Sequence, residues 1–116
     1  MTKLHGVARI KIHPGKLEAF QQAVAECVAL TREKNPGTLR YEWYLNDEQT
    51  VCTLLETYES SEAVLIHLGN LGDAIYRLLA CGELSGEIFG NPSSELRQAV
   101  AEMPIKFYPL WQGLGA

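Results

Sequence analysis

Residues 50–68, TVCTLLETYESSEAVLIHL, predict a buried strand followed by a capped helix. The strand part, Thr50 to Glu59, is rich in the Val, Thr, Leu and Tyr residues that favour strands. Because successive side chains of a strand point to opposite faces, both faces carry apolar groups. One face has Val51 and Leu55, and the other has Cys52, Leu54 and Tyr58. We therefore expect a strand that is covered on both sides.

Polar groups accompany this strand and the helix after it. Glu56 falls on the strand face that carries Tyr58. Ser60 or Ser61 can accept a hydrogen bond from the first turn of the helix. His67 lies two turns into that helix. The corner between strand and helix thus collects a carboxylate, an aromatic ring and a histidine.

Two strands and a long helix are predicted before this stretch. The alternation of Leu4 to Ile12 is typical of a half-buried strand. Lys16 to Lys34 has apolar residues at steps of three and four, as an amphipathic helix does, and Asn35-Pro36-Gly37 ends it. Thr38 to Asn46 alternates again. A short polar connection then leads into the strand at 50–59, so these two strands should form an antiparallel hairpin.

Further elements are predicted after His67. The helix that begins near Glu62 is expected to kink near Gly69 or Gly72. Gly82, Gly86 and Gly90 either leave one strand face open to close backbone approach or mark a turn with bulges. The expected ranges are helices at 62–71, 73–81 and 94–103 and strands at 83–91 and 105–111.

The order β-α-β-β-α-β, with a further helix and strand, predicts an α+β protein with a ferredoxin-like split βαβ fold. We expect one domain over residues 1–116, with an elaborated C-terminal part from about residue 71. In this fold the main helices cover one face of the sheet only. No spare segment is long enough to cover the other face, so we infer a twofold homodimer packed sheet on sheet. The space beside the sheet could hold a small apolar ligand.

Composition restricts the classes of partner. With 47% hydrophobic and 21% charged residues, the 116-residue chain has the profile of a soluble globular protein. A net charge of −4 and scattered basic residues argue against nucleic acid. Three cysteines without CxxC spacing argue against a disulfide scaffold or a zinc site and fit a reducing cytoplasm. No apolar run approaches ~18 residues, so no membrane span is expected.

Several short motifs, taken in order, resemble one family. They are Pro14-Gly15, Thr31-Arg32 leading to Pro36-Gly37, Leu39, Tyr41, Glu56, Tyr58, Ser60, Ala63 and His67. Over about residues 4–70 the pattern resembles the antibiotic biosynthesis monooxygenase domain, including its quinol monooxygenase-like members. The resemblance implies a ferredoxin-like dimeric α+β barrel. It also implies oxidation of a small aromatic, phenolic or quinol-type substrate by O₂ without a metal, flavin or other cofactor.

Some residues depart from the family pattern. Tyr58 stands where many members have Trp, and Asn35 replaces the Glu of a common Glu-Pro-Gly sequence. The first strand has no Asn at the position that haem-degrading relatives use. Haem binding or degradation is therefore the least favoured function.

His67 is the first candidate for catalysis. A base that removes a phenolic proton makes the substrate electron-rich enough to donate to O₂, and histidine titrates in a suitable range. The alternative is a structural histidine that fills a gap in the core or bonds to a backbone carbonyl.

Glu56 is the second catalytic candidate, because a carboxylate on an apolar strand face is costly unless it has a partner. It could orient His67 or bind a substrate hydroxyl. The alternative is an ion pair with one of three arginines in a dimer interface. These are Arg9, Arg32 and Arg40.

Three aromatic residues, Tyr41, Trp43 and Tyr58, are candidates for substrate binding, although ordinary core packing also explains them. The three histidines have no metal-ligand spacing, and the motifs of serine hydrolases, zinc proteases and P-loop proteins are missing. Two functions remain open. One is a cofactor-independent monooxygenase, and the other is a non-catalytic module of the same fold that binds a small ligand or dimerises.

Overall fold

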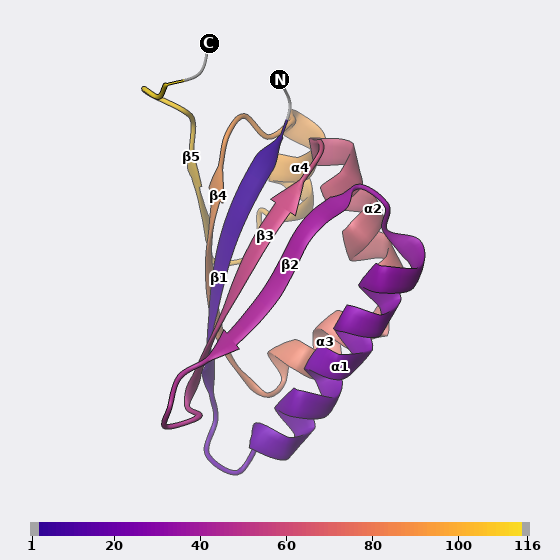
Figure 1. Cartoon of the computed structure of the whole chain (residues 1–116), viewed down its shortest axis with the longest axis vertical. Helices are drawn as coiled ribbons and strands as arrows, with labels where there is room; N and C mark the ends of the chain where they lie inside the picture. The colour runs from indigo at the N-terminus through magenta and orange to yellow at the C-terminus, as the bar shows by residue number, and fades with distance from the viewer. Residues whose placement is uncertain (1–2, 115–116) are drawn as a thin grey trace.

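A computed structural model describes residues 3–114 of the chain, and within them the strands form one mixed sheet with helices on one side (Figure 1). The elements are, in order, β1 Leu4–Ile12, α1 Leu17–Lys34, β2 Thr38–Leu45, β3 Val51–Tyr58, α2 Ser61–Leu71, α3 Asp73–Leu79, β4 Gly82–Phe89, α4 Ser94–Ala99 and β5 Ile105–Tyr108. The strand order in the sheet is β2-β3-β1-β4-β5. β1 pairs antiparallel with both β3 and β4, and β2 pairs antiparallel with β3. This confirms the predicted α+β, ferredoxin-like fold.

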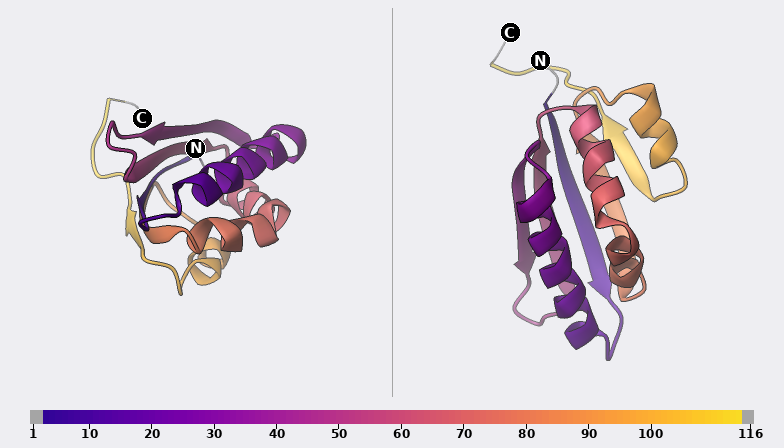
Figure 2. Two further views of the ribbon diagram at one scale, coloured as in Figure 1. Left: turned by 90° about the horizontal axis from the view of Figure 1, so that it is seen from below. Right: turned by 90° about the vertical axis from the view of Figure 1, so that its right-hand side faces the viewer.

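β5 extends this sheet beyond the split βαβ unit. It pairs with β4 in parallel, which requires a crossover connection, and α4 lies in that crossover. Figure 2 shows α1 and α2 side by side over the same face of the sheet. The two main helices therefore leave the other face of the sheet free of helix, as predicted.

The predicted helices around the central corner are confirmed with small changes. Ser60 is the cap of α2, because its hydroxyl accepts a hydrogen bond from the amide of Ala63. Of the two glycines proposed for the kink, Gly72 separates α2 from α3, and its φ of 51° is a conformation that glycine adopts without strain. Gly69 remains inside α2.

Two C-terminal predictions were too long. The helix predicted over 94–103 ends at Ala99, after which a turn brings the chain back toward the sheet. The strand predicted over 105–111 ends at Tyr108, because its partner β4 ends at Phe89 and Pro109 has no N–H to donate. Trp111 consequently lies outside the sheet, with 89% of its surface exposed.

The core lies between the sheet and the helices. One cluster of buried residues joins α1 and α3 to the sheet and includes Phe20, Cys27 and Leu78. A second cluster joins α2 and α4 to the sheet around Leu4 and Leu96. The elaborated C-terminal part therefore supplies part of the interior wall at one end of the molecule.

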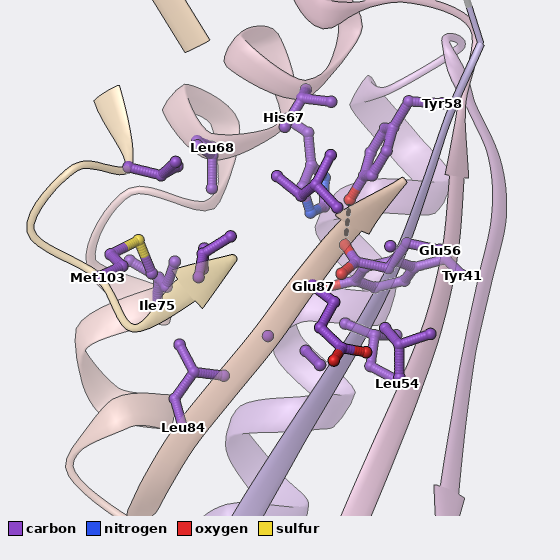
Figure 3. A pocket seen from close by; sticks show the side chains of 18 of the residues that line it. Tyr41, Leu54, Glu56, Tyr58, His67, Leu68, Ile75, Leu84, Glu87 and Met103 are labelled. Atoms are coloured by element: carbon purple, nitrogen blue, oxygen red, sulfur yellow. Dashed lines mark hydrogen bonds between the residues drawn. The ribbon is translucent and has the colours of Figure 1, made fainter. Parts of the chain in front are cut away.

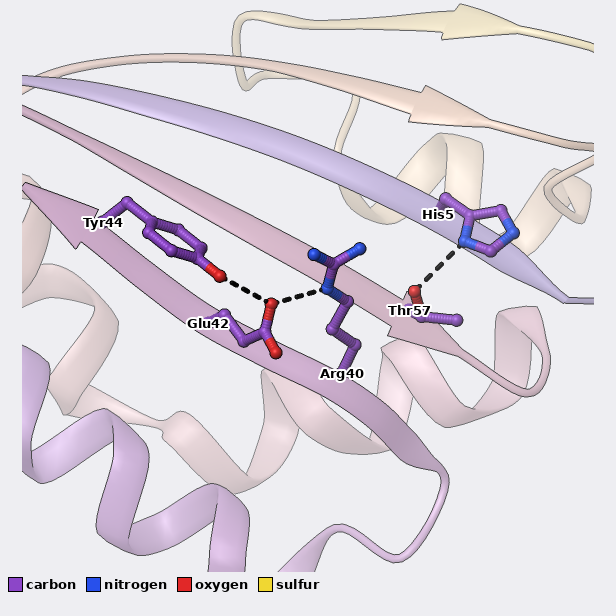
Figure 4. A network of polar contacts seen from close by, with 5 residues as sticks. All are labelled: His5, Arg40, Glu42, Tyr44 and Thr57. Carbon is purple, nitrogen blue, oxygen red and sulfur yellow. Dashed lines mark hydrogen bonds and ion pairs between the residues drawn. The ribbon is translucent and has the colours of Figure 1, made fainter.

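The helix-free face of the sheet mixes apolar and polar side chains. On it, the Glu42 carboxylate accepts hydrogen bonds from Arg40 Nε at 2.7 Å and from the Tyr44 hydroxyl at 3.0 Å, and His5 Nδ1 lies 3.1 Å from Thr57 Oγ1 (Figure 4). The covering of this face by a second copy stays a prediction. Within residues 3–114, no helix has the length and apolar character needed to cross a membrane.

Candidate functional site

A cavity of about 120 Å³ lies between the sheet and helices α2 and α3. The predicted site residues all line it: Tyr41, Trp43, Glu56, Tyr58 and His67. The sequence had placed Glu56 and His67 at one corner, and the structure brings both to the same cavity. Figure 3 shows Glu56 and Tyr58 of β3 bonded to each other, with His67 reaching toward them from α2.

The strand register explains the position of Glu56. β3 turns Glu56 toward the helices, beside Gly6 of the neighbouring strand β1. A Cβ atom on Gly6 would lie 3.4 Å from Glu56 Oε2, so the missing side chain of Gly6 leaves the space that the carboxyl group occupies. The Tyr58 hydroxyl donates a hydrogen bond to Glu56 Oε1. Glu56 thus has a local partner on its own strand.

This geometry argues against the ion-pair alternative for Glu56. The alternation of β3 places its side chain under the helices and not on the helix-free face. Among the described residues, no ion pair joins Glu56 to the three arginines considered above, and Arg40 is paired with Glu42 instead.

Burial controls the charge of Glu56. The residue as a whole keeps some exposure, but its carboxyl group is enclosed by protein atoms, and this raises its pKa from 4.5 to about 7. The hydrogen bond from Tyr58 acts in the opposite direction, because it favours the carboxylate. The same burial, together with the nearby charge of Glu56, raises the pKa of Tyr58 well above its usual value. At neutral pH, Glu56 can therefore either accept or donate a proton.

His67 is almost completely buried, with 2% of its surface exposed. Its ring lies between two aromatic rings, with centroid distances of 5.0 Å to Tyr41 and 5.4 Å to Tyr58. Burial lowers the pKa of His67 from 6.5 to about 4, so the imidazole is neutral near pH 7. Because the pKa of His67 is lower than that of Glu56, the imidazole is the weaker proton acceptor of the two.

One ring nitrogen of His67 is left without a hydrogen-bond partner among residues 3–114. Nδ1 is buried and makes no hydrogen bond within the part of the chain that the structure describes. A bond from Nδ1 to a backbone carbonyl, one form of the structural alternative, is therefore absent among the described residues, whereas the other form, a histidine that fills a gap in the core, agrees with the burial of the ring. Trp43 Nε1 is also buried, and no described residue bonds to it. Buried polar atoms of this kind are uncommon in native proteins and mark places where a ligand or water can bond.

The sequence did not predict the other walls of the cavity. Core-facing positions of β1 and β4 carry Gly6, Ala8 and Gly86, whose small size leaves room above the sheet. Met103 and Ile105, from the elaborated C-terminal part, also line the cavity. In the sequence, these small residues at core-facing strand positions were the signal that could have predicted the cavity. Among residues 3–114, no three His, Cys, Asp or Glu side chains are grouped closely enough to hold a metal ion.

The fold and this cavity define a class of α+β proteins with a ferredoxin-like core and an interior site. The family model "Antibiotic biosynthesis monooxygenase" matches residues 4–71, more than half of the chain. The chain belongs to this family. No curated protein matches the sequence.

Solved structures show the same fold. MupZ from Pseudomonas fluorescens is 24% identical, with a TM-score of 0.85 over 100% of this chain and 96% of its own. SnoaB, a cofactor-independent oxygenase from Streptomyces nogalater, is 18% identical, with a TM-score of 0.67 over 81% of this chain and 97% of its own. A conserved protein from Methanosarcina mazei Go1 is 20% identical, with a TM-score of 0.68 over 76% of this chain and 91% of its own. The likeness to MupZ extends over the C-terminal elaboration, which the family model does not match.

Proposed function

We propose that the chain is a cofactor-independent monooxygenase that oxidises a small aromatic, phenolic or quinol-type substrate with O₂. Family membership supports a monooxygenase-like role. The observation that carries the proposal is the enclosed carboxyl group of Glu56, whose pKa of about 7 suits proton transfer at neutral pH. Both Tyr58 and His67 lie beside this group, in the same largely apolar cavity.

The proposed first step is removal of the substrate's hydroxyl proton by Glu56. The O–H bond breaks, the proton moves to the carboxylate, and the electron pair stays on the substrate oxygen. The resulting anion gives an electron to O₂ more readily than the neutral phenol does. The substrate supplies all four electrons that reduce O₂, as in the conversion of a phenol to a quinone, so that one oxygen atom enters the product and the other leaves as water with two hydrogen atoms of the substrate. His67 would remain neutral and bond to the substrate or to the intermediate.

Oxygen uptake with a panel of phenols and quinols tests this proposal. We expect consumption of O₂ that rises with pH as Glu56 ionises near pH 7, and a loss of at least about 100-fold in Glu56→Gln, the usual range for a lost general base. Ile66→Ala is a matched control, because Ile66 lies on the same helix as His67 but is about half exposed. The proposal fails if no substrate in the panel stimulates uptake, or if Glu56→Gln and His67→Ala keep full activity.

The second function is a non-catalytic module of the same fold that binds a small ligand or only dimerises, and the small cavity favours it because an oxygenase site must hold both a substrate and O₂. At about 120 Å³ the cavity lies below the roughly 300–1,000 Å³ of most ligand pockets. Saturable binding of a phenol without O₂ uptake would support this function. A cavity of this size gives no support to haem binding. Addition of haemin without a Soret shift is the expected result.

We also propose that the protein is a homodimer in which the helix-free sheet faces meet. Support comes from the partly buried apolar residues of this face, namely Val7, Val51, Leu55 and Phe89. Light scattering at micromolar concentration should give twice the mass of one chain. A monomeric mass would refute the dimer and leave the cavity unaffected.

A further inference from the structure

The side chains that can form hydrogen bonds in the cavity come from one part of the fold. They belong to β2, β3 and α2, and they are Tyr41, Trp43, Glu56, Tyr58 and His67. We call the part of the cavity that they line its polar part. A substrate hydroxyl group bonded to Glu56 would lie there.

His5 and Glu87 also border the cavity, but their side chains point away from it. Side chains alternate along a strand, and the next residues, Gly6 and Gly86, occupy core-facing positions. His5 accordingly bonds to Thr57 on the helix-free face (Figure 4). His5 and Glu87 therefore bring backbone atoms, and no side-chain charge, to the cavity.

Aliphatic side chains line another part of the cavity. We call four of them the aliphatic wall: Ile75 of α3, Leu84 of β4, Met103 from the segment between α4 and β5, and Ile105 of β5. In Figure 3, Ile75, Leu84 and Met103 lie apart from Glu56. Strand β1 separates β3 from β4 in the sheet, so at least two strand spacings, about 10 Å, lie between the backbones of Glu56 and Leu84.

The aliphatic wall suits a small apolar guest better than it suits water. An ordered water in a protein interior needs two to four polar partners, and the wall has no N–H or O–H group on its side chains. Cavities lined by Leu, Ile and Phe stay dry and bind apolar guests such as xenon. The polarizable sulfur of Met103 adds to the attraction for such a guest. O₂ is small, uncharged and apolar, so it belongs to the same class of guest as xenon.

The two parts of the cavity are suited to different stages of O₂ chemistry. Neutral O₂ is at ease in apolar surroundings, but the anion that forms when it takes up an electron is costly to bury without hydrogen bonds. Such bonds are available in the polar part, where His67 Nδ1 has no partner among the described residues. Gly6 and Ala8 of β1 lie between the two parts, and neither has a side chain large enough to separate them.

We propose that the aliphatic wall is a binding site for O₂, separate from the place of the substrate beside Glu56. The gas waits there in its neutral form and is reduced in the polar part. The identity of the gas rests on the proposed function, whereas the affinity of the wall for a small apolar gas does not. O₂ has only two atoms, so it occupies a small share of the cavity's volume of about 120 Å³ and leaves the rest to the substrate.

Xenon is the probe for this site, because it binds without reacting. Methyl NMR under increasing xenon pressure should show saturable shifts for Ile75, Leu84 and Ile105. The methyl groups of Ile66, which is about half exposed on α2, should not show them. The affinity for phenol, measured by calorimetry without turnover, should change by less than about twofold under xenon, because the two molecules occupy different parts of the cavity.

A pair of matched variants locates the site. Ile75→Phe fills the space at the wall, and the xenon-induced shifts of Leu84 and Ile105 should disappear. With a phenol that is turned over, the variant should raise KM for O₂ about tenfold and change kcat at saturating O₂ by less than about twofold. Ile66→Phe makes the same chemical change on the exposed side of α2 and should behave as the unchanged protein.

Three results would overturn the inference. These are the absence of saturable xenon shifts at the wall, full retention of these shifts in Ile75→Phe, and displacement of phenol by xenon. If Ile75→Phe does not fold, Leu84→Phe takes its place, with the shifts read at Ile75 and Ile105. Xenon binding at the wall without O₂ uptake by any phenol would refute the oxygenase proposal and leave the gas site in place.

Discussion

The stability of Glu56→Gln, compared with that of the unchanged protein, should increase as the pH rises. In the folded state the carboxyl group of Glu56 has a pKa of about 7, raised from 4.5 by burial. A group with a raised pKa contributes stability that is fully present below its unfolded pKa and is lost as the pH rises through its folded pKa. Glutamine keeps the shape of the neutral acid and cannot ionise, so the variant should not show this loss.

The size of the effect follows from the same values. One pKa unit corresponds to about 1.4 kcal/mol, so a rise from 4.5 to about 7 corresponds to roughly 3 kcal/mol in the free energy of unfolding. The difference in stability between Glu56→Gln and the unchanged protein should grow by this amount between pH 4 and pH 8.

His67 has the opposite effect on stability. Its pKa is lowered from 6.5 to about 4, so its contribution is present above pH 6.5 and is lost as the pH falls through about 4. Between pH 4.5 and pH 6.5 the two groups partly cancel in the unchanged protein. Glu56→Gln should therefore reveal a stability that rises with pH over this interval.

Urea unfolding at pH 4, 5, 6, 7 and 8 measures these free energies. Glu48→Gln is the matched control, because Glu48 lies exposed in the β2–β3 connection, and it should differ from the unchanged protein by a constant amount. If the difference between Glu56→Gln and the unchanged protein does not vary with pH, the carboxyl group is not held neutral by burial. The proposed proton-transfer role would then lose its main support.

Three further outcomes are expected. Tyr58→Phe should raise the pKa of Glu56 above about 7, because it removes the hydrogen bond that favours the carboxylate. ¹³C NMR of the carboxyl carbon measures this pKa, and an unchanged or lowered value would contradict the role given to this hydrogen bond. Ser60→Ala should cost about 1 kcal/mol in urea unfolding, because the cap of α2 is lost, and no loss would show that the cap is dispensable. Cys27 is completely buried, and burial raises the pKa of its thiol to about 11. A thiol reagent should therefore label Cys27 only when the protein unfolds, and fast labelling of the native protein would contradict this packing.

Local patterns predicted the regular part of the fold well. The alternation of Leu4 to Ile12 predicted both ends of β1 correctly, because every second residue of this range faces the core. The polar connection after Leu45 correctly predicted a hairpin, and Gly72 was one of two glycines named for the helix break. These features depend on periodicity and turn chemistry, both of which are local.

Positions set by tertiary pairing were harder to predict. β5 ends where β4 stops offering partners, and Pro109 is the one local signal of that end, which the expected range of 105–111 passed over. The cavity is a similar case, because it depends on which small residues of different strands become neighbours. Glu56 and His67 were identified as candidates, but their charge states depend on enclosure, which only the fold provides.

The parallel pairing of β5 has a consequence for the way in which the cavity opens. β5 is a four-residue edge strand, joined to the sheet on one side only and through a crossover, not a hairpin. Few hydrogen bonds hold it, so β5 and the turn before it should detach locally at a lower free energy than the central strands. Met103 and Ile105 would leave with it. Fraying of the sheet's last strand would then widen the cavity at this end, and a bound ligand would slow amide hydrogen exchange in β5 before it slowed exchange in β1.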